Sequence, residues 1–276
     1  MELSVNNLNL KYDIQVLSNI SFKLNNNTIM AIAGKNGSGK TSLIESIFGI
    51  RNANGKILFN NKNIRNNIEF KNKTGIISND FPFIYDLSLL YNLKYFLLIN
   101  KINITNNEID NALSKFNLLK HKNRKMGILS NGMKIKFQIM YNYLKKPELL
   151  FMDEPTAFLD IDSQNYIVNL IKDIKNNNSF FKSCIMATHN MDLIKMSDDI
   201  LLLSDGKIIE HNNFNYIINE FKNKYVVIAD KYINLLNNIN YNETSNNRLI
   251  IKIDDYNKLS KKPDVLEINY GDIFGE

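Results

Sequence analysis

The chain has 276 residues, of which 44% are hydrophobic and 22% charged, and a formal net charge of +6. These proportions describe an ordinary globular protein of one large or two modest domains, and they exclude a disordered or fibrous chain. No apolar run approaches the roughly 18 to 20 residues of a membrane span, and residues 1–4 lack a signal-peptide pattern, so we expect neither.

The cysteine content indicates the redox compartment of the protein, and the positive charge indicates what its surface can contact. The single cysteine, Cys184, excludes an internal disulfide and fits a reducing cytosol. The stretch between Asp110 and Glu148 contains no acidic residue. Its basic residues form either a solvated face or a surface close to lipid headgroups or nucleotide phosphate, and they are Lys115, Lys120, Lys122, Arg124, Lys125, Lys134, Lys136, Lys145 and Lys146.

The N-terminal residues predict strands. Residues 1–24 alternate apolar and polar side chains, and residues 28–33 form an apolar run typical of a buried strand. Tyr12 lies between the first two predicted strands. A tyrosine there is usually an ordinary strand residue, although its ring could instead stack on a nucleotide base.

Residues 34–41 read GKNGSGKT and fit the phosphate-binding P-loop pattern. They follow the predicted strand and precede a predicted helix that begins near Ser42. Glycines allow backbone N–H groups to face phosphate oxygens, and the helix N-terminus adds partial positive charge. We expect Lys40 to reach the β- and γ-phosphates and the Thr41 hydroxyl to ligate Mg²⁺. The predicted nucleoside triphosphate site comprises Gly34, Lys35, Asn36, Gly37, Ser38, Gly39, Lys40, Thr41 and Ser42.

A helical block is inserted between the following strands. Short strands are predicted at residues 55–59 and 74–78. Helical periodicity then covers residues 86–100 and 106–117, and a third helix follows Ser130. The first of these helices places Leu90, Leu93, Leu97 and Leu98 on one stripe. We therefore expect a helical subdomain over about residues 81–146 within an alternating βα domain.

The apolar strand at residues 149–153 ends in Asp153-Glu154. Without a P-loop, these would be ordinary acidic turn residues. Because this chain also has a P-loop, we expect Asp153 to hold Mg²⁺ from a strand adjacent to the P-loop strand. Glu154 is then placed to polarise the water that attacks the γ-phosphate.

The rest of the chain predicts further α/β structure. A helix at residues 161–175 precedes a strand at 184–187, which ends in Thr188-His189-Asn190. Asp205-Gly206 predicts a hairpin turn. From about residue 213 the composition changes, and we expect helices near 213–222 and 230–238 with strands at 226–228 and 248–253. The predicted domains are residues 1–212 and a small α/β extension at 213–276.

The order of these motifs resembles one family. Alone, Ser130-Asn131-Gly132 is an ordinary helix N-cap. Placed after a P-loop and a helical insert, and before Asp153-Glu154 and His189, it resembles the signature motif of the ATP-binding subunit of ATP-binding-cassette (ABC) transporters. The resemblance covers about residues 1–212. It implies an ATPase with ATP and Mg²⁺ as cofactors, and an α/β P-loop NTPase (RecA-like) core with an antiparallel β subdomain and an inserted helical subdomain.

The resemblance also implies roles for individual residues. Residues 34–41 correspond to the Walker A loop and 149–153 to the Walker B strand. Glu154 resembles the catalytic glutamate, and His189 the switch histidine that contacts the γ-phosphate. Tyr12 resembles the aromatic residue that stacks on adenine.

Two further motifs imply a dimer. Ser130, Asn131 and Gly132 belong to the signature motif, which in this family closes on ATP held by the other subunit. A serine hydroxyl and N–H groups at a helix N-terminus suit an anion. Asp160 fits the D-loop at the dimer seam.

This sequence departs from the family at several positions. Asn79 stands where the family usually has the glutamine of the Q-loop, with Asp80 as the alternative. A shorter amide could still reach Mg²⁺ or its water, so the predicted metal contacts are Thr41, Asp153 and Asn79. In the signature motif, Asn131 and Met133 replace the common Gly and Gln, and Met133 resembles exporter-type members.

The implied partners are an integral-membrane permease and a second ATPase subunit, identical or paralogous, with no nucleic acid. The implied location is the cytoplasmic face of the cell membrane. We expect an exporter of a peptide, bacteriocin or drug-like compound, with an importer or a DNA-associated or regulatory ATPase as alternatives. Seven residues either form a groove for the permease or pack in the core, namely Phe81, Phe83, Ile84, Tyr85, Tyr91, Tyr95 and Phe96.

Overall fold

The computed structural model describes residues 1–65, 67–176, 178–179, 181–236, 239–244, 247–259 and 262–274. A six-stranded sheet lies at its centre, with strand order β10-β9-β3-β8-β7-β6. Five strands are parallel, and β10 pairs antiparallel with β9 through the predicted hairpin. The strands are β3 (Ile29–Ala33), β6 (Thr74–Ser78), β7 (Leu149–Asp153), β8 (Ser183–Ala187), β9 (Asp199–Ser204) and β10 (Lys207–Asn212).

Alternate residues of the central strands bury their side chains on opposite faces of this sheet. Met30 and Phe151 pack with α1 (Lys40–Phe48) on one face. Leu150 and Met152 pack with α5 (Asn131–Lys145) and α6 (Ile161–Lys175) on the other. A parallel sheet covered on both faces explains the near-continuous apolar runs of these strands.

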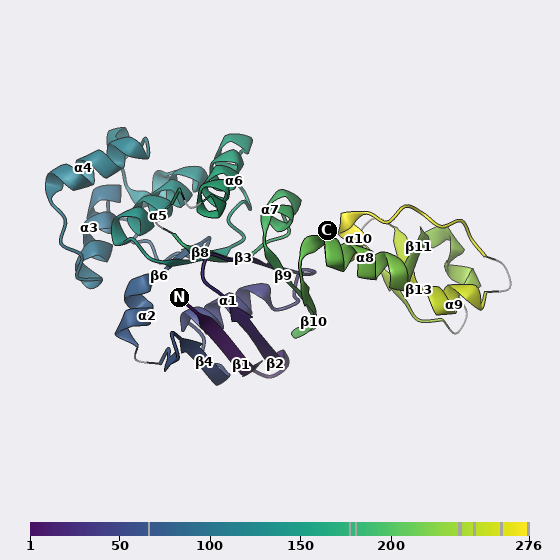
Figure 1. Cartoon of the computed structure of the whole chain (residues 1–276). Helices are drawn as coiled ribbons and strands as arrows, with labels where there is room; N and C mark the ends of the chain where they lie inside the picture. The colour runs from purple at the N-terminus through teal and green to yellow at the C-terminus, as the bar shows by residue number, and fades with distance from the viewer. Residues whose placement is uncertain are drawn as a thin grey trace.

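A second, antiparallel sheet has the order β2-β1-β4-β5. Its strands are β1 (Leu3–Lys11), β2 (Gln15–Leu24), β4 (Asn54–Phe59) and β5 (Lys62–Asn63). Helix α1 lies between this sheet and the central one (Figure 1), and its buried residues belong to one cluster with both. The strands expected at residues 1–24 and 55–59 are confirmed.

The predicted helical block contains α3 (Leu89–Ile99), α4 (Asn106–Lys115) and α5. Hydroxyl groups cap all three helices, from Ser88, Thr105 and Ser130. The predicted apolar stripe of α3 is wrong at Leu98, which is 77% exposed. The helix instead buries Leu89, Leu93, Phe96 and Leu97, because its contact with α5 lies on that side. Two 3₁₀ turns complete the block, at Leu119–His121 and Met126–Ile128.

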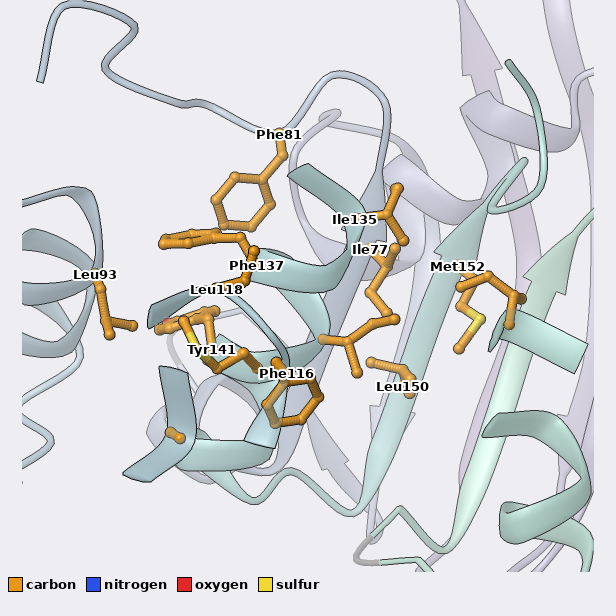
Figure 2. Packing of buried hydrophobic residues seen from close by; sticks show 14 of the residues in the cluster. Ile77, Phe81, Leu93, Phe116, Leu118, Ile135, Phe137, Tyr141, Leu150 and Met152 are labelled. Carbon is orange, nitrogen blue, oxygen red and sulfur yellow. The ribbon is translucent and has the colours of Figure 1, made fainter. Parts of the chain in front are cut away.

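Helix α5 joins the helical block to the central sheet. Figure 2 shows Phe137 and Tyr141 of α5 between Leu93 of α3 and the sheet residues Leu150 and Met152. All five side chains belong to a single buried cluster. The helical block and the sheet are therefore packed through α5.

The seven residues of the expected aromatic groove divide between the two interpretations. Phe81, Phe83 and Phe96 are buried, and the ring of Phe81 packs against those of Phe83 and Phe96 at 4.8 and 4.9 Å. Ile84 is partly buried. Three tyrosines are exposed by 43–65%, namely Tyr85, Tyr91 and Tyr95. The phenylalanines are core residues, and the tyrosines are available to a partner.

Helix α6 has the bounds expected from the sequence. Within residues 1–212, two short α-helices were not predicted: α2 (Ile68–Lys73) and α7 (Met191–Met196), each only six residues long. Cys184 lies fully buried in β8. Burial raises the pKa of its thiol, so this cysteine is a packing residue in the core.

The C-terminal segment forms a small three-stranded sheet of order β11-β13-β12. Its elements are α8 (Phe214–Lys224), β11 (Tyr225–Ala229), β12 (Tyr241–Glu243), β13 (Arg248–Lys252), α9 (Ile253–Asn257) and α10 (Tyr270–Phe274). The helix expected at 230–238 is a 3₁₀ helix at Asp230–Leu235, and residues 237–238 lie outside the described residues. A domain boundary at 212/213 stays a prediction.

The end of the chain returns to the central sheet. The small sheet lies away from the rest of the fold, whereas α10 lies beside α8 and near β9 and β10 (Figure 1). Phe274 stacks on Phe214 at 5.8 Å and joins a buried cluster with Ala31 of β3 and Ile200 of β9. None of the helices within the described residues is long and apolar enough to cross a membrane.

Candidate functional site

The loop between β3 and α1 takes a conformation that depends on glycine. Gly34 and Gly39 have φ values of 144° and 102°, in the region that favours glycine. A Cβ on Gly34 would lie 2.1 Å from the carbonyl oxygen of Leu203. Gly39 is the N-cap of α1, and no side chain among the described residues caps this helix. The N–H groups of the first turn of α1 are therefore left for another acceptor.

Two observations show that this loop fits a phosphate group. The Ser38 hydroxyl is buried and has no hydrogen-bond partner among the described residues. The N-terminus of α1 lacks both a side-chain cap and an acidic residue in its first turn. Open donors at a helix N-terminus form an anion site.

Lys40 is a buried cation at the same place. Its ammonium donates to the carbonyl oxygens of Gly34 at 2.8 Å and Lys35 at 3.3 Å, and lies 3.9 Å from Glu154 Oε1. Only 7% of its side chain is exposed. Burial lowers the pKa of Lys40, while the charges of Glu154 and Asp153 oppose this shift. A buried ammonium beside an open anion site is suited to bind phosphate oxygens.

Thr41 and Asp153 form the oxygen-rich part of the site. The Thr41 hydroxyl donates to Asp153 Oδ1 at 3.0 Å. Burial raises the pKa of Asp153 to about 6, against the lowering effect of the Thr41 hydrogen bond, and the charge of Glu154 adds to the rise. Hydroxyl and carboxylate oxygens are ligands that Mg²⁺ prefers, so this pair fits the metal.

The prediction that β7 lies directly next to the P-loop strand β3 is wrong. In the sheet, β8 lies between β3 and β7. Thr41 still meets Asp153 because α1 packs across β7 and β8, and because parallel strands end at the same edge of the sheet. The intervening β8 ends just before Thr188-His189, which places the histidine in the site.

Glu154 stands between Lys40 and His189. Its Oε2 lies 2.8 Å from Nδ1 of His189 and its Oε1 3.9 Å from Lys40 Nζ. Its φ is 44°, a left-handed conformation that is unusual for a glutamate and costs of order 1 kcal/mol. Its backbone N–H donates to the Ala187 carbonyl at the end of β8, which fixes this turn. A carboxylate held between two cationic or basic groups can accept a proton from water.

Asn79 also reaches this turn. It follows β6, the neighbour of β7, and its amide Nδ2 donates to the Glu154 carbonyl oxygen at 3.4 Å. Asp80, the alternative, is exposed, and its charge contributes to the raised pKa of Asp153. Asn79 thus contacts the backbone of the residue after Asp153, and a metal contact from Asn79 stays a prediction.

The signature-motif residues lie at the start of α5. The Ser130 hydroxyl accepts the Met133 N–H at 3.2 Å, as an N-cap does. Asp160 caps α6 in the same way, and its Oδ1 accepts the Ser163 N–H at 2.8 Å. The two helix starts are in contact, because a Cβ on Gly132 would lie 2.4 Å from Ser163 Oγ. Asn131 is exposed at the first position of α5.

Tyr12 is 53% exposed at the turn between β1 and β2. Its hydroxyl accepts a hydrogen bond from Arg51 Nη1 at 2.7 Å, and the Arg51 guanidinium lies 5.7 Å from the ring centroid. Arg51 in turn pairs with Glu45 of α1. Neither Arg51 nor Glu45 was predicted as a site residue, because nothing in their local sequence pattern separates them from surface charges.

Comparison with known proteins gives a consistent result. Residues 17–157, about half of the chain, match the model of the ABC transporter family. The chain is 36% identical over 210 residues to the lipoprotein-releasing system ATP-binding protein LolD of Buchnera aphidicola subsp. Acyrthosiphon pisum, covering 73% of this chain and 89% of that protein. It is 31% identical over 208 residues to the zinc import ATP-binding protein ZnuC of Buchnera aphidicola subsp. Baizongia pistaciae, covering 75% and 82%.

A solved structure supports the same fold. The ATP-binding cassette MJ0796, in a dimeric post-hydrolysis state bound to ADP and phosphate, matches with a TM-score of 0.68 at 20% identity. The match covers 76% of this chain and 98% of that chain. This likeness and the predicted P-loop NTPase fold agree. The chain belongs to the ABC transporter family, as an ATP-binding subunit that hydrolyses ATP with Mg²⁺ as its metal.

Proposed function

We propose that this chain powers an exporter of a peptide, bacteriocin or drug-like compound, through ATP-driven dimerisation coupled to a separate membrane permease. The observation that carries the ATP-driven part of the proposal is the cluster of Lys40, Thr41, Asp153, Glu154 and His189 at one edge of the central sheet. Met133 in the signature motif and the small α/β extension favour export. The two relatives take part in lipoprotein release and zinc import by name, so export is the finer part of the proposal.

Within one chain, Lys40 exchanges its carbonyl partners for the β- and γ-phosphates of ATP, and Ser38 and the first turn of α1 donate to the same oxygens. Thr41 and Asp153 hold Mg²⁺, with Asn79 as the third contact. Bound Mg²⁺ neutralises charge on the phosphate oxygens. Tyr12 stacks on the adenine, with its ring held by Arg51.

Glu154 and His189 carry the hydrolytic step. Glu154 accepts a proton from the water whose oxygen attacks the γ-phosphorus, while the bond between that phosphorus and the bridging oxygen breaks and ADP leaves. His189 lies 2.8 Å from Glu154 and is placed to hold its carboxylate and to contact the γ-phosphate. The Lys40 ammonium attracts the same oxygens, which stabilises the charge that develops on them.

The second subunit contributes its Ser130–Gly132 segment to the nucleotide. The Ser130 hydroxyl and the N–H groups at the start of α5 suit the γ-phosphate of the facing copy. Exposed apolar residues surround this face, namely Ile128, Phe158 and Ile161, which are 72–85% exposed. Burial of these side chains and the bridging γ-phosphate favour the closed dimer, and hydrolysis removes the bridge.

The permease docks on the helical block at the cytoplasmic face of the membrane. Tyr85, Tyr91 and Tyr95 offer it an exposed aromatic surface on and next to α3. Opening and closing of the ATPase dimer then moves the permease through this contact.

The ATPase assignment of Glu154 is tested with Glu154→Gln, which keeps the shape of the side chain and removes its basicity. Glu148→Gln is the matched control, since Glu148 precedes the same strand and pairs with Lys73. We expect Glu154→Gln to bind ATP, to lose hydrolysis and to sediment as a dimer with ATP, while Glu148→Gln hydrolyses ATP normally. Turnover by Glu154→Gln at the wild-type rate would contradict the general-base role.

Export is tested with the membrane protein that co-purifies with this chain. In inside-out vesicles that contain the complex, we expect ATP to drive substrate into the vesicle. ATP-dependent release of a preloaded substrate would instead identify an importer. Stimulation of the ATPase rate by DNA, with no membrane partner recovered, would favour the DNA-associated alternative.

A further inference from the structure

Two buried side-chain amides of α5 bind the outer edge of the central sheet. Strand β6 is at that edge, with β7 as its only strand neighbour among the described residues. Gln138 Oε1 accepts the Ser78 N–H, and Gln138 Nε2 donates to the Ser78 carbonyl oxygen, both at 2.9 Å. Asn142, one turn further along α5, donates to the Ile76 carbonyl oxygen at 3.0 Å. Gln138 and Asn142 are 1% and 0% exposed.

The physical basis of this contact is the unpaired edge of a parallel strand. The N–H and C=O groups that point away from β7 need partners once helices cover the edge. A glutamine amide carries both an acceptor and a donor, so Gln138 pairs with Ser78 as another strand residue would. The close approach requires a glycine in β6, because a Cβ on Gly75 would lie 2.0 Å from Asn142 Oδ1.

The contact joins two parts of the nucleotide site. Asn79, the proposed metal contact, directly follows Ser78. Ser130, the start of the signature motif, lies about two helical turns before Gln138 on the same helix. Gln138 therefore links the residue that serves the chain's own nucleotide to the motif that serves the facing subunit's nucleotide.

We propose that Gln138 is a positioning residue that holds Asn79 at the metal and ties it to the signature helix. The inference rests on the proposed function, since it takes the metal contact of Asn79 from there. Phe137 and Tyr141 of α5 pack on the helical block in the same cluster as Leu93 (Figure 2). Any displacement of the helical block that carries α5 with it thus also moves Ser78 and Asn79.

The asymmetry of the two amides provides an internal control. Gln138 bonds the residue next to Asn79, whereas Asn142 bonds Ile76, further back within β6. Each removal takes one buried amide from the same helix face. Only the loss of Gln138 frees the backbone that carries Asn79.

The experiment measures Mn²⁺ binding to the ADP-bound chain by electron paramagnetic resonance, which needs no turnover. The variants are Gln138→Met, Asn142→Ala, Asn79→Ala and the Asn79→Ala/Gln138→Met double variant. We expect Gln138→Met and Asn79→Ala each to raise the Mn²⁺ dissociation constant about tenfold, the lower end for a lost supporting contact. Asn142→Ala stays within about twofold of wild type, and the double variant binds no more weakly than Asn79→Ala.

The outcomes separate the two layers of the proposal. If Asn79→Ala weakens Mn²⁺ binding but folded Gln138→Met binds Mn²⁺ as the wild type does, the inference about Gln138 is overturned and the proposed function is not. Multiplying effects in the double variant also overturn it, because Gln138 would then act independently of Asn79. Wild-type binding in Asn79→Ala removes the metal contact from the proposed function, and this inference with it. Gln138→Ala, with the high helix propensity of alanine, is the second variant if Gln138→Met lacks a cooperative thermal transition, with the same expectation.

Discussion

The glycine of the signature motif is explained by packing inside one chain, and this can be tested. Gly132 lies in the first turn of α5, against the first turn of α6. The contact that excludes a side chain here is specific: an alanine Cβ would lie 2.4 Å from Ser163 Oγ and 3.3 Å from Ser163 Cβ. We therefore expect Gly132→Ala to destabilise the chain through Ser163.

The magnitude follows from these two distances. Real Cβ atoms essentially never lie within 3.0 Å of such an atom, so the Ser163 hydroxyl must retreat by at least 0.6 Å. Ser163 is only 7% exposed, so its hydroxyl has little room to move. Overpacking of this kind costs about 1–3 kcal/mol. Ser163→Ala leaves only the 3.3 Å contact, and it should recover most of that loss.

The assay is urea denaturation of the two single variants and the Gly132→Ala/Ser163→Ala double variant, followed by ATPase measurement on the folded proteins. We expect a coupling free energy of about 1–2 kcal/mol between the two sites. Additive effects on the free energy of unfolding would refute the packing explanation. A stable double variant without ATPase activity would show that Gly132 is also needed for backbone approach to the facing nucleotide.

Three further predictions concern charge and burial. Burial lowers the pKa of Lys145 from 10.5 to about 8, so folding is penalised while this lysine is protonated in the unfolded chain. This penalty is full below about pH 8 and disappears above pH 10.5. Lys145→Met should therefore raise the free energy of unfolding by at most about 3 kcal/mol at pH 7 and by little at pH 10.5. Urea denaturation at the two pH values measures the difference. Arg51→Ala removes the hydrogen bond to Tyr12, so it should weaken ATP and ADP binding about threefold to tenfold in calorimetry. Binding of inorganic tripolyphosphate, which has no base, should be unchanged. Weaker binding of all three ligands would contradict a role through the base. The buried Cys184 thiol should react with a thiol reagent only at the rate of global unfolding, and fast labelling of the folded chain would contradict its burial.

The sequence was sufficient to predict the strands and helices that carry the short, ordered motifs. The glycines of residues 34–41 predicted a loop between a strand and a helix, and Asp153-Glu154 ends an apolar run typical of a buried strand. The helix expected at residues 161–175 has these bounds, and Asp160 is its N-cap.

What the sequence could not supply depends on contacts between distant segments. The insertion of β8 between β3 and β7 is a matter of strand order, which local periodicity does not encode. Leu98 is exposed although it fits the helical stripe, because the packing of α3 against α5 decides which face is buried. Gln138 looked like an ordinary polar helix residue, since its partner Ser78 is 60 residues away.

The last turn of the chain has a practical consequence for handling the protein. Phe274 is fully buried in a cluster with Phe214 and with Ala31 of β3, the strand that leads into the P-loop. Deletion of the residues from Tyr270 onward would expose an apolar surface beside that strand, and exposed apolar patches promote aggregation.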